Sequence, residues 1–364
     1  MSTPSPHHVR RSPRRRLVRY VLAGALLTLP VASEVSSCAA PFDPQSEIKT
    51  VRVLSVDIDK PYANAGDTVT FKMNYYDGRD ATGTFAPIQI TWLGGCFNPP
   101  GDAYYGCYDQ LGQLLQQVAS GEIPPDGLVA QGPGLDTFSI KLPSDIVTSV
   151  AEPNAGPRLG VGFVFFTVCA GEVRPVYDEG STDAGSFPLG CFDANGNQLG
   201  SDSFIPGYTQ VYAFEDERTN AAPPVDAFMF DDKPLAEGDV GEARACAFSD
   251  EERNKTGCAA PDVAAECDVI SVDVDVPKNV ADVDADAFDA EGNALHEVVW
   301  VDYFADGGTF DNDLKLVSDA STGEIDDHST TWTPPEEPGL YSMWAVVRDN
   351  RGGSTTVQRY IEVK

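Results

Sequence analysis

Catalytic sequence motifs are scarce in this chain. It has four histidines, and two of them, His7 and His8, lie within the first ten residues. No Gly-x-Ser-x-Gly motif, P-loop or Cys-x-x-Cys pair occurs, so the commonest signals of hydrolases, nucleotide-binding proteins and zinc ribbons are missing. The segment His296-Glu297 begins like a zinc-protease helix, but Trp300 replaces the second histidine and the residues alternate as in a strand. We therefore expect a protein that is not an enzyme.

Basic residues are also few. The chain has 25 Lys and Arg against 56 Asp and Glu, a net charge of −31. Residues 1–37 hold six arginines and one glutamate, so without them 19 basic and 55 acidic residues would remain. Such a charge repels nucleic acid and anionic lipid headgroups, and we expect neither as a partner. The acids are spread along the sequence, which is typical of a solvated surface, and binding of calcium or of a basic partner is the functional alternative.

No apolar run is long enough to cross a bilayer, which takes about 20 residues. The apolar segment at residues 21–29 follows six arginines and precedes several small residues, as in an export signal. Residues 14–19 also resemble a twin-arginine motif, so general secretion and twin-arginine export both stay open.

The end of this segment, Val35-Ser36-Ser37-Cys38, resembles the lipobox of bacterial lipoproteins. The resemblance implies that residues 1–37 are a cleaved signal peptide, that Cys38 is acylated and that residues 38–47 are a spacer. Ala39 is not the aspartate associated with inner-membrane retention, so the implied location is the outer membrane or the cell surface. A plain cleaved signal without a lipid is the alternative.

Eight cysteines fit an exported, oxidised protein. If Cys38 carries lipid, seven are left, and one of these is free or paired outside the chain. Sequence proximity favours a Cys96–Cys107 disulfide, a Cys169–Cys191 disulfide and one pair among Cys246, Cys258 and Cys267. Connectivity does not follow from sequence alone, so these pairs are hypotheses.

Residues 48–219 alternate as in a β-sandwich. Apolar residues alternate with polar ones from Val69 to Tyr75, a third strand holds Trp92, and Gly94-Gly95 is predicted to break it. A helix is predicted between Asp109 and Gly121, where Leu111, Leu114, Leu115 and Val118 recur at helical spacing. Paired prolines make residues 220–224 a linker.

Residues 225–364 repeat this plan, with Trp300 in the position of Trp92. Trp300 is followed by Pro335-x-x-Pro-Gly-x-Tyr341, a β-strand and Asp349-Asn-x-Gly-Gly353. This order resembles immunoglobulin-like domains of the polycystic-kidney-disease and cadherin-like types, closely over residues 280–364 and by architecture over residues 48–215. The predicted fold is therefore all-β: two immunoglobulin-like antiparallel β-sandwich domains in tandem, with one short helix in a long loop of the first.

Two similar segments, Phe192 to Asn197 and Phe288 to Asn293, are predicted to be β-hairpin turns, because Gly and Asn tolerate positive φ. Acids gather around the second of them. Asp284, Asp286, Asp289, Glu291 and Asn293, with Asp349 from another loop, offer the oxygen ligands that calcium prefers. We expect no required cofactor, and calcium is the one metal that these residues suit.

A tyrosine-rich loop is the second candidate site. Tyr104, Tyr105 and Tyr108 lie near Phe97, where they would either form a binding surface or cover the edge of a core. The functional expectation is a lipid-anchored extracytoplasmic cell-envelope protein that acts as a non-catalytic binding or structural module, with an unidentified envelope protein or polysaccharide as partner. The alternative is a secreted or surface carbohydrate-binding or hydrolytic accessory protein that uses this loop.

Overall fold

The computed structural model describes residues 45–364 apart from 80–86, 121, 123–126, 154–155, 177–186, 254 and 256–260, and apart from the side chains of Asp102, Ala119, Ala285 and Asp286. The predicted signal peptide, Cys38 and Cys258 therefore lie outside the described residues. Within that part, no helix is both long and apolar enough to cross a membrane.

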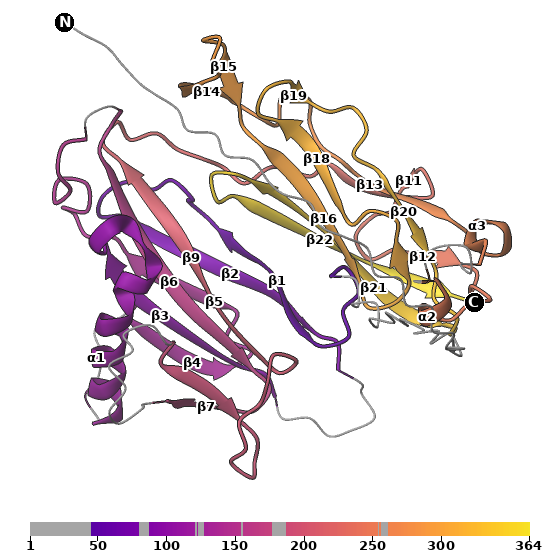
Figure 1. Ribbon diagram of the computed structural model, residues 1–364, viewed down its shortest axis with the longest axis horizontal. Helices are drawn as coiled ribbons and strands as arrows, with labels where there is room; N and C mark the ends of the chain where they lie inside the picture. Colours follow the sequence, from indigo (N-terminus) through magenta and orange to yellow (C-terminus); the bar gives the residue numbers. More distant parts are fainter. Residues whose placement is uncertain are drawn as a thin grey trace, which may run out of the picture. The chain divides into compact units, whose positions relative to one another are not determined.

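Two antiparallel sheets form the first sandwich (Figure 1). One has the order β1-β2-β5, from β1 (Val51–Ile58), β2 (Thr68–Asp77) and β5 (Thr137–Lys141). The other has the order β4-β3-β6-β9, from β3 (Gln89–Phe97), β4 (Val129–Pro133), β6 (Leu159–Cys169) and β9 (Phe204–Phe214). Trp92 is fully buried between the sheets, 5.6 Å from the Phe138 ring and 5.7 Å from the Phe166 ring.

The break predicted at Gly94-Gly95 is an irregularity within the third strand and not its end. β3 continues to Phe97, with a register shift against β6 between Leu93 and Cys96. Gly95 has φ 88°, which glycine adopts at little cost, so the strand accommodates an irregularity there and then resumes pairing. Because β3 lies between β4 and β6, its backbone groups find hydrogen-bond partners on both sides.

The outer face of the β4-β3-β6-β9 sheet carries the predicted helix. α1 (Tyr108–Ala119) follows two short 3-10 helices, η1 (Pro100–Asp102) and η2 (Tyr104–Cys107), and lies against this sheet (Figure 1). Leu111 and Leu115 are buried there in a cluster with Phe163 and Phe165 of β6. Cys96 and Cys107 form a disulfide that joins β3 to the start of the helix. Both the helix and the disulfide were expected from the sequence.

A hairpin between β6 and β9 holds the second disulfide. It consists of β7 (Glu172–Pro175) and β8 (Leu189–Phe192), and Cys191 of β8 is bonded to Cys169 at the end of β6. This pair confirms the hypothesis drawn from the spacing of the cysteines. The disulfide therefore closes the base of this hairpin.

The second sandwich has a five-stranded and a six-stranded sheet. The first has the order β11-β10-β13-β20-β17: β10 (Ala227–Phe230), β11 (Lys233–Pro234), β13 (Ile270–Asp275), β17 (Thr309–Phe310) and β20 (Thr330–Thr333). The other has the order β12-β22-β21-β16-β18-β19: β12 (Val240–Ala243), β16 (Val299–Ala305), β18 (Leu314–Asp319), β19 (Gly323–Glu324), β21 (Gly339–Asp349) and β22 (Ser354–Val363). β12 and β22 run parallel, and the other pairs of these two sheets are antiparallel. The fold is thus all-β, with two immunoglobulin-like sandwiches.

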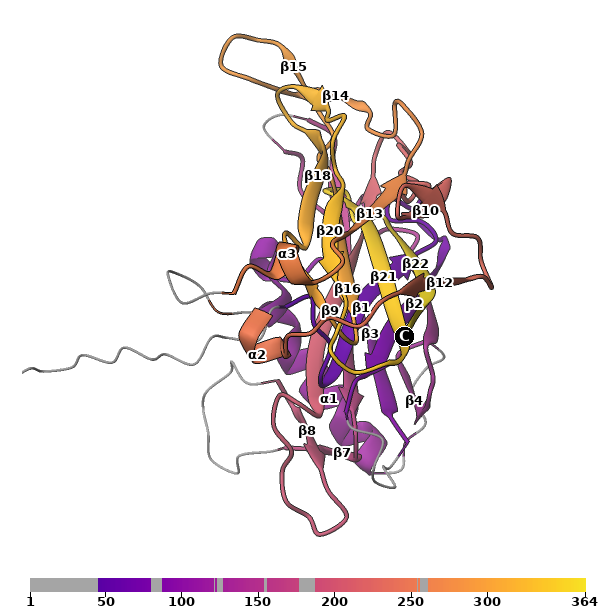
Figure 2. The same ribbon diagram turned by 90° about the vertical axis from the view of Figure 1, so that its right-hand side faces the viewer.

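Two insertions extend the second sandwich. The hairpin of β14 (Val283–Phe288) and β15 (Ala294–His296) projects beyond β18 (Figure 2). The other insertion contains α2 (Asp250–Arg253) and α3 (Val263–Glu266) and is closed by a disulfide between Cys246 and Cys267. The structure thereby selects one of the three pairs that the sequence left open.

The core tryptophan of the second sandwich is Trp332 of β20, not Trp300. In β16, Val299, Val301 and Tyr303 face the core and are fully buried, so Trp300 points to the opposite side and is only half-buried. Trp332 is fully buried and donates a hydrogen bond from Nε1 to the carbonyl of Gly307 at 3.1 Å. The sequence placed Trp300 in the position of Trp92, but in the structure Trp332 fills the corresponding place in the second core.

Residues 41–364 form one compact unit, in which β1 packs against β21 and β22. Leu54 of β1 forms a buried cluster with Trp344 and Val346, and the Tyr76 ring lies 4.7 Å from the Trp344 ring. The outward face of β21 is therefore buried by the first sandwich.

Polar contacts accompany this apolar cluster. Tyr76 donates to Asp306 at 2.7 Å, and the Ser354 hydroxyl donates to Asp57 at 2.7 Å. Arg348 donates to the carbonyl of Leu54. Charged and hydroxyl groups at the contact are thus paired across it, as buried polar groups require.

The chain segment before β1 pairs with the second sandwich. Ala305 donates from its backbone to the carbonyl of Ser46 at 2.9 Å, and Ile48 donates to the carbonyl of Ala305 at 2.8 Å. The Glu47 carboxylate between them is buried and lies 3.1 Å from Nζ of Lys49. The start of the described chain therefore contacts the second sandwich before it enters β1.

Candidate functional site

The predicted tyrosines lie on the outer face of the first sandwich. Tyr104 and Tyr105 belong to η2, and Tyr108 begins α1. Tyr104 stacks on Tyr208 of β9, with ring centroids 4.4 Å apart and an angle of 17° between the ring planes. The Tyr104 ring also lies 5.7 Å from Tyr105 and 6.0 Å from Tyr108. The structure thus brings the three predicted residues together and adds Tyr208.

These rings border a cavity of about 400 Å³. Its other walls come from β6, from β9 and from the loop before β8, and its lining residues are Tyr104, Tyr108, Phe165, Phe166, Phe187, Pro206, Gly207 and Tyr208. We call this cavity the aromatic groove. Sequence reasoning missed Phe187 and Tyr208, because both are distant from the tyrosine loop along the chain; alternation in β9, which sends Tyr208 and Tyr212 to one face, was the available signal.

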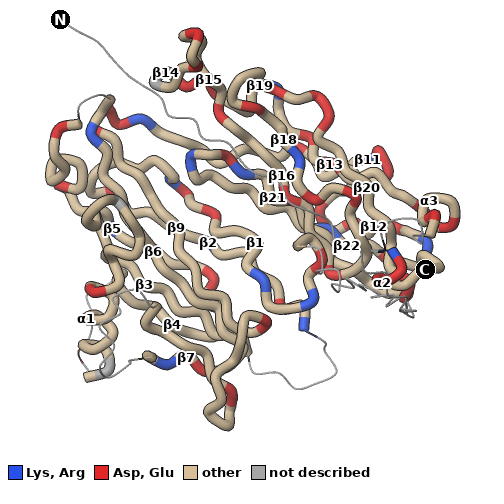
Figure 3. Tube along the Cα trace, in the orientation of Figure 1, with Lys and Arg blue, Asp and Glu red and all other residues tan. Residues whose placement is uncertain are grey.

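The sheet beneath the aromatic groove is uncharged. None of β3, β4, β6 and β9 contains Asp, Glu, Lys or Arg, in a chain of which 22% is charged. Figure 3 shows acidic positions on both sandwiches, while strands β3, β4 and β6 are free of them. Among the described residues, none that lines the groove is charged.

The tyrosines keep part of their surface in contact with solvent. Tyr104 is 37% exposed, Tyr105 61% and Tyr208 43%. Their hydroxyls have no hydrogen-bond partner within the part of the chain that the structure describes. Burial raises the pKa of the Tyr108 phenol, and nearby Tyr104 and Tyr208 add to that shift, so the group stays protonated at neutral pH.

The residues predicted for calcium occupy turns whose hydrogen bonds are local. One Asp289 carboxylate oxygen accepts from the backbone of Glu291 at 3.0 Å and of Asn293 at 2.7 Å, and the other accepts from the Asn293 side chain at 2.8 Å. The turn at Asp193 has the same bonds to Asn195 and Asn197. The prediction that both segments are turns is confirmed.

Asp349 repeats this turn in a buried position. One of its carboxylate oxygens accepts from the backbone of Arg351 and Gly353, and the other accepts from the Asn220 side chain at 2.8 Å. Burial raises the pKa of its carboxyl. Asp349 therefore connects the turn after β21 to Asn220, the first residue of the predicted linker 220–224.

The acids proposed as calcium ligands are not gathered into a recognisable site. Within the described residues, no three His, Cys, Asp or Glu side chains form a group that could hold a metal ion. Asp284 belongs to β14, and the side chain of Asp286 lies outside the described part. Calcium binding stays a prediction that experiment has to test.

The other titratable groups have structural partners. Nδ1 of His328 lies 2.8 Å from the Asp273 carboxylate, which raises the pKa of the imidazole. Glu297 is buried, and burial raises its pKa, while Arg351 lies 3.5 Å away. His296 is in β15, so the Glu297 beside it does not lie on a helix as in the zinc-protease motif.

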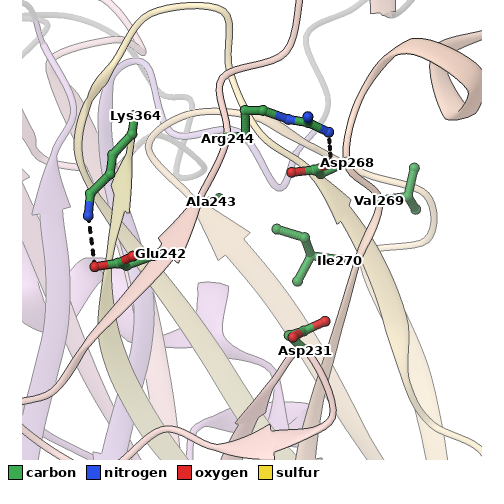
Figure 4. A pocket seen from close by; sticks show the side chains of 8 residues that line it. All are labelled: Asp231, Glu242, Ala243, Arg244, Asp268, Val269, Ile270 and Lys364. Atoms are coloured by element: carbon green, nitrogen blue, oxygen red, sulfur yellow. Dashed lines mark hydrogen bonds and ion pairs between the residues drawn. The ribbon is translucent and has the colours of Figure 1, made fainter.

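A second cavity, of about 470 Å³, opens beside β12 (Figure 4). Its charged residues form pairs: Lys364 lies 2.7 Å from Glu242, Lys233 lies 2.9 Å from Asp231, and Arg244 pairs with Asp268. Exposed pairs of this kind contribute little to stability. The charges lining this cavity are thus matched within the chain and do not specify a ligand.

Comparison with known proteins gives no family. No family model matches this chain, and no curated protein matches it. Among solved structures, it is similar to the fibronectin(III)-like modules of Clostridium thermocellum CbhA, with 10% identity over 85% of this chain and 94% of that chain and a TM-score of 0.20. It is also similar to dimeric latent PorU from Porphyromonas gingivalis, with 10% identity over 87% of this chain and 24% of that chain and a TM-score of 0.19.

A third similar structure is a bacterial ice-binding adhesin involved in host cell surface retention. It is 12% identical over 88% of this chain and 67% of that chain, with a TM-score of 0.18. Scores this low support no argument about function. The functional case therefore depends on this chain's own residues.

Proposed function

We propose that this protein is exported, anchored to the outer membrane or cell surface through acylated Cys38, and acts there as a non-catalytic binding or structural module. The observation that carries the proposal is the set of disulfides Cys96–Cys107, Cys169–Cys191 and Cys246–Cys267. Disulfides persist in oxidising compartments outside the cytoplasm. An export-type segment and a lipobox-like tetrapeptide precede the two sandwiches.

The contact between the sandwiches supports a structural role. Leu54, Trp344 and Val346 are buried where β1 meets β21. The Arg348 side chain donates hydrogen bonds to Asp302 of the neighbouring strand β16 and to the backbone carbonyl of Leu54 in β1. A buried apolar contact with paired polar groups restrains motion between modules. We infer that the two sandwiches act as one stiff unit.

The hydrolytic alternative has weaker support. Glycoside hydrolysis needs two carboxyl groups on either side of the scissile bond. The carboxyls with raised pKa in the described part are Glu47, Glu297, Asp306 and Asp349. The first two and the last are buried, Asp306 is half-buried, and none lines the aromatic groove. We retain the carbohydrate-binding part of this alternative and develop it below.

Intact mass of the protein extracted from membranes tests the anchor. We expect a chain that begins at Cys38, carries acyl groups and has at most one thiol open to alkylation. Cys38→Ala should lose the acyl mass, and Ser37→Ala is the matched control that should keep it. A wild-type chain without acyl groups, cut at another residue, would refute the lipid anchor and favour a soluble exported protein.

A further inference from the structure

We propose that the aromatic groove is a binding site for a neutral polysaccharide. This inference deepens the proposed function, since it names the ligand class of a binding module. It starts from three features of the groove in the described part of the chain: partly exposed tyrosine rings, lining residues that carry no charge, and phenol hydroxyls without partners. A sugar ring matches all three, because it has an apolar face of C–H groups and a rim of hydroxyls.

The ring arrangement provides the apolar contact. Tyr104 and Tyr208 stack at 4.4 Å, and Phe165 lies 6.0 Å from Tyr208. The disulfide from Cys107, which directly precedes Tyr108, to β3 holds the tyrosine loop in place. Apart from Phe187 in the loop before β8, the lining residues come from strands β6 and β9, from the start of α1 and from the cross-linked tyrosine loop, so little conformational entropy of these parts is lost when a ligand binds.

The backbone at the floor of the groove is closely packed. A Cβ added to Gly207 would meet the Phe166 ring at 2.4 Å, and Phe166 reaches the sandwich core. Any residue other than glycine would push the strand or this ring out of place. The cavity thus depends on a glycine that also brings Pro206 and Tyr208 into position beside it.

Charge selects among polymers. The chain has a net charge of −31, which disfavours the approach of acidic polysaccharides. A cationic ligand would find no carboxylate among the described residues that line the groove, and burial of an unpaired charge is costly. A neutral chain meets neither difficulty, so the uncharged β4-β3-β6-β9 sheet fits a neutral partner.

The exposed hydroxyls supply polar contacts. Tyr104, Tyr105 and Tyr208 can each donate and accept one hydrogen bond. If these rings only covered the edge of the core, burial would be expected, but Tyr105 is 61% exposed and Tyr208 43%. Apolar walls with a few convergent polar groups are typical of small-molecule and sugar sites.

Native affinity electrophoresis of the full chain in detergent tests this proposal. The gels contain xylan, mixed-linkage β-glucan, galactomannan or starch as neutral probes, and alginate or polygalacturonate as acidic probes. We expect retardation by at least one neutral polymer and by neither acidic one. Tyr208→Ala and Tyr104→Ala should weaken that binding by about tenfold or more, as expected for loss of a central aromatic contact.

Controls separate binding from folding. Tyr208→Phe keeps the stacked ring and should retain most of the affinity. Tyr360→Ala removes a tyrosine of similar exposure, 42%, from β22 and should change nothing. In the wild-type chain, the bound polymer should protect Tyr104, Tyr105 and Tyr208 from nitration and leave Tyr360 reactive, which requires no variant to fold.

The proposal would be overturned if no neutral polymer retarded the protein, or if retardation survived both Tyr208→Ala and Tyr104→Ala. It would also be overturned if the groove were occupied by a polyproline peptide, or by a second copy of this chain that light scattering detects as a dimer. The acyl mass and the disulfides are measured separately. If the sugar site is refuted, the proposal of an anchored structural module is therefore unaffected.

Discussion

At the scale of single residues, close packing around Trp332 decides which backbone positions tolerate a side chain. Gly308 has φ 82°, and a Cβ there would lie 2.4 Å from Nε1 of Trp332 and 2.6 Å from the carbonyl oxygen of Thr333. Gly238 has a similar φ of 86° but no atom within 4 Å of the added Cβ. Both positions impose backbone strain on any other residue, but only Gly308 also imposes a steric conflict. Substitutions at the two positions therefore distinguish these effects.

We expect Gly308→Ala to lower the free energy of unfolding by about 3 kcal/mol, from backbone strain together with overpacking. Gly238→Ala, the matched control, should cost only about 1 kcal/mol, because backbone strain acts alone there. Urea unfolding measures both. Equal losses in the two variants would show that the tryptophan does not restrict Gly308.

Glu47 makes stability depend on pH. Burial raises the pKa of its carboxyl from 4.5 to about 7, and Asp250 adds to the shift, while Lys49 opposes it. The folded protein therefore holds this proton more tightly than the unfolded chain does. The resulting stability is fully present below about pH 4.5 and is lost as the pH rises to about 7.

Glu47→Gln should remove this loss. At pH 8 we expect the variant's free energy of unfolding to exceed that of wild type by about 1 kcal/mol, which raises its unfolding temperature. Near pH 4.5 the two proteins should be equally stable. The gain is kept small because the variant also loses the ion pair to Lys49. Calorimetry across this pH range gives the answer, and a constant difference between the two proteins would contradict the assignment.

At the scale of elements, a covalent link holds α1 and the tyrosine loop on the sheet. Cys96 and Cys107 are 11 residues apart, and a loop of that size loses about 2–3 kcal/mol of stability when its disulfide is removed. Since Tyr104 lies inside the loop, its stacking on Tyr208 should loosen at the same time.

The double variant Cys96→Ser and Cys107→Ser should therefore lose both stability and sugar affinity. Removal of Cys246 and Cys267, which are 21 residues apart in the second sandwich, should cost about 3 kcal/mol and leave sugar affinity unchanged. Thermal unfolding and affinity electrophoresis report the two effects. Unchanged sugar affinity in the variant without Cys96 and Cys107 would show that the disulfide is not needed to hold the aromatic groove in its binding shape.

At the scale of the whole molecule, the contact between the sandwiches should make them unfold together. Trp344 is 4% exposed and packs against Tyr76 and Leu54 of the first sandwich. Its truncation should uncouple them, so we expect Trp344→Ala to split one calorimetric transition into two and to lower the first midpoint. Loss of a buried tryptophan costs about 3–5 kcal/mol.

Leu340→Ala is the control for this change, since Leu340 lies in the same strand but is 63% exposed. It should leave a single transition in place. A single transition in Trp344→Ala as well would mean that the apolar contact does not couple the sandwiches.

The stability of the whole molecule should not depend on a bound metal ion. We expect a chelator to leave the melting temperature unchanged, because the Asp289 and Asp349 carboxylates already accept hydrogen bonds from their own turns. A ligand that binds only the folded state raises stability with its concentration. A rise on adding calcium, reversed by chelator, would contradict this expectation and show that the folded protein binds calcium.

Alternation of apolar and polar residues predicted β2, because a strand places alternate residues on opposite faces. Val69 to Tyr75 lies within that strand, and Leu111 and Leu115 marked α1. Short chain separation also predicted two of the disulfides, since the loop entropy favours nearby cysteines.

The sequence by itself determined the all-β class, the strands, the helix and the tyrosine-rich loop, because local periodicity and composition encode them. Only the tertiary structure decided that Trp332 and not Trp300 fills the second core, that Cys246 bonds to Cys267, and that Tyr208 completes the aromatic groove. Those outcomes depend on which segments distant in the chain pack together, and pairing of distant segments leaves no local pattern for sequence reasoning to detect.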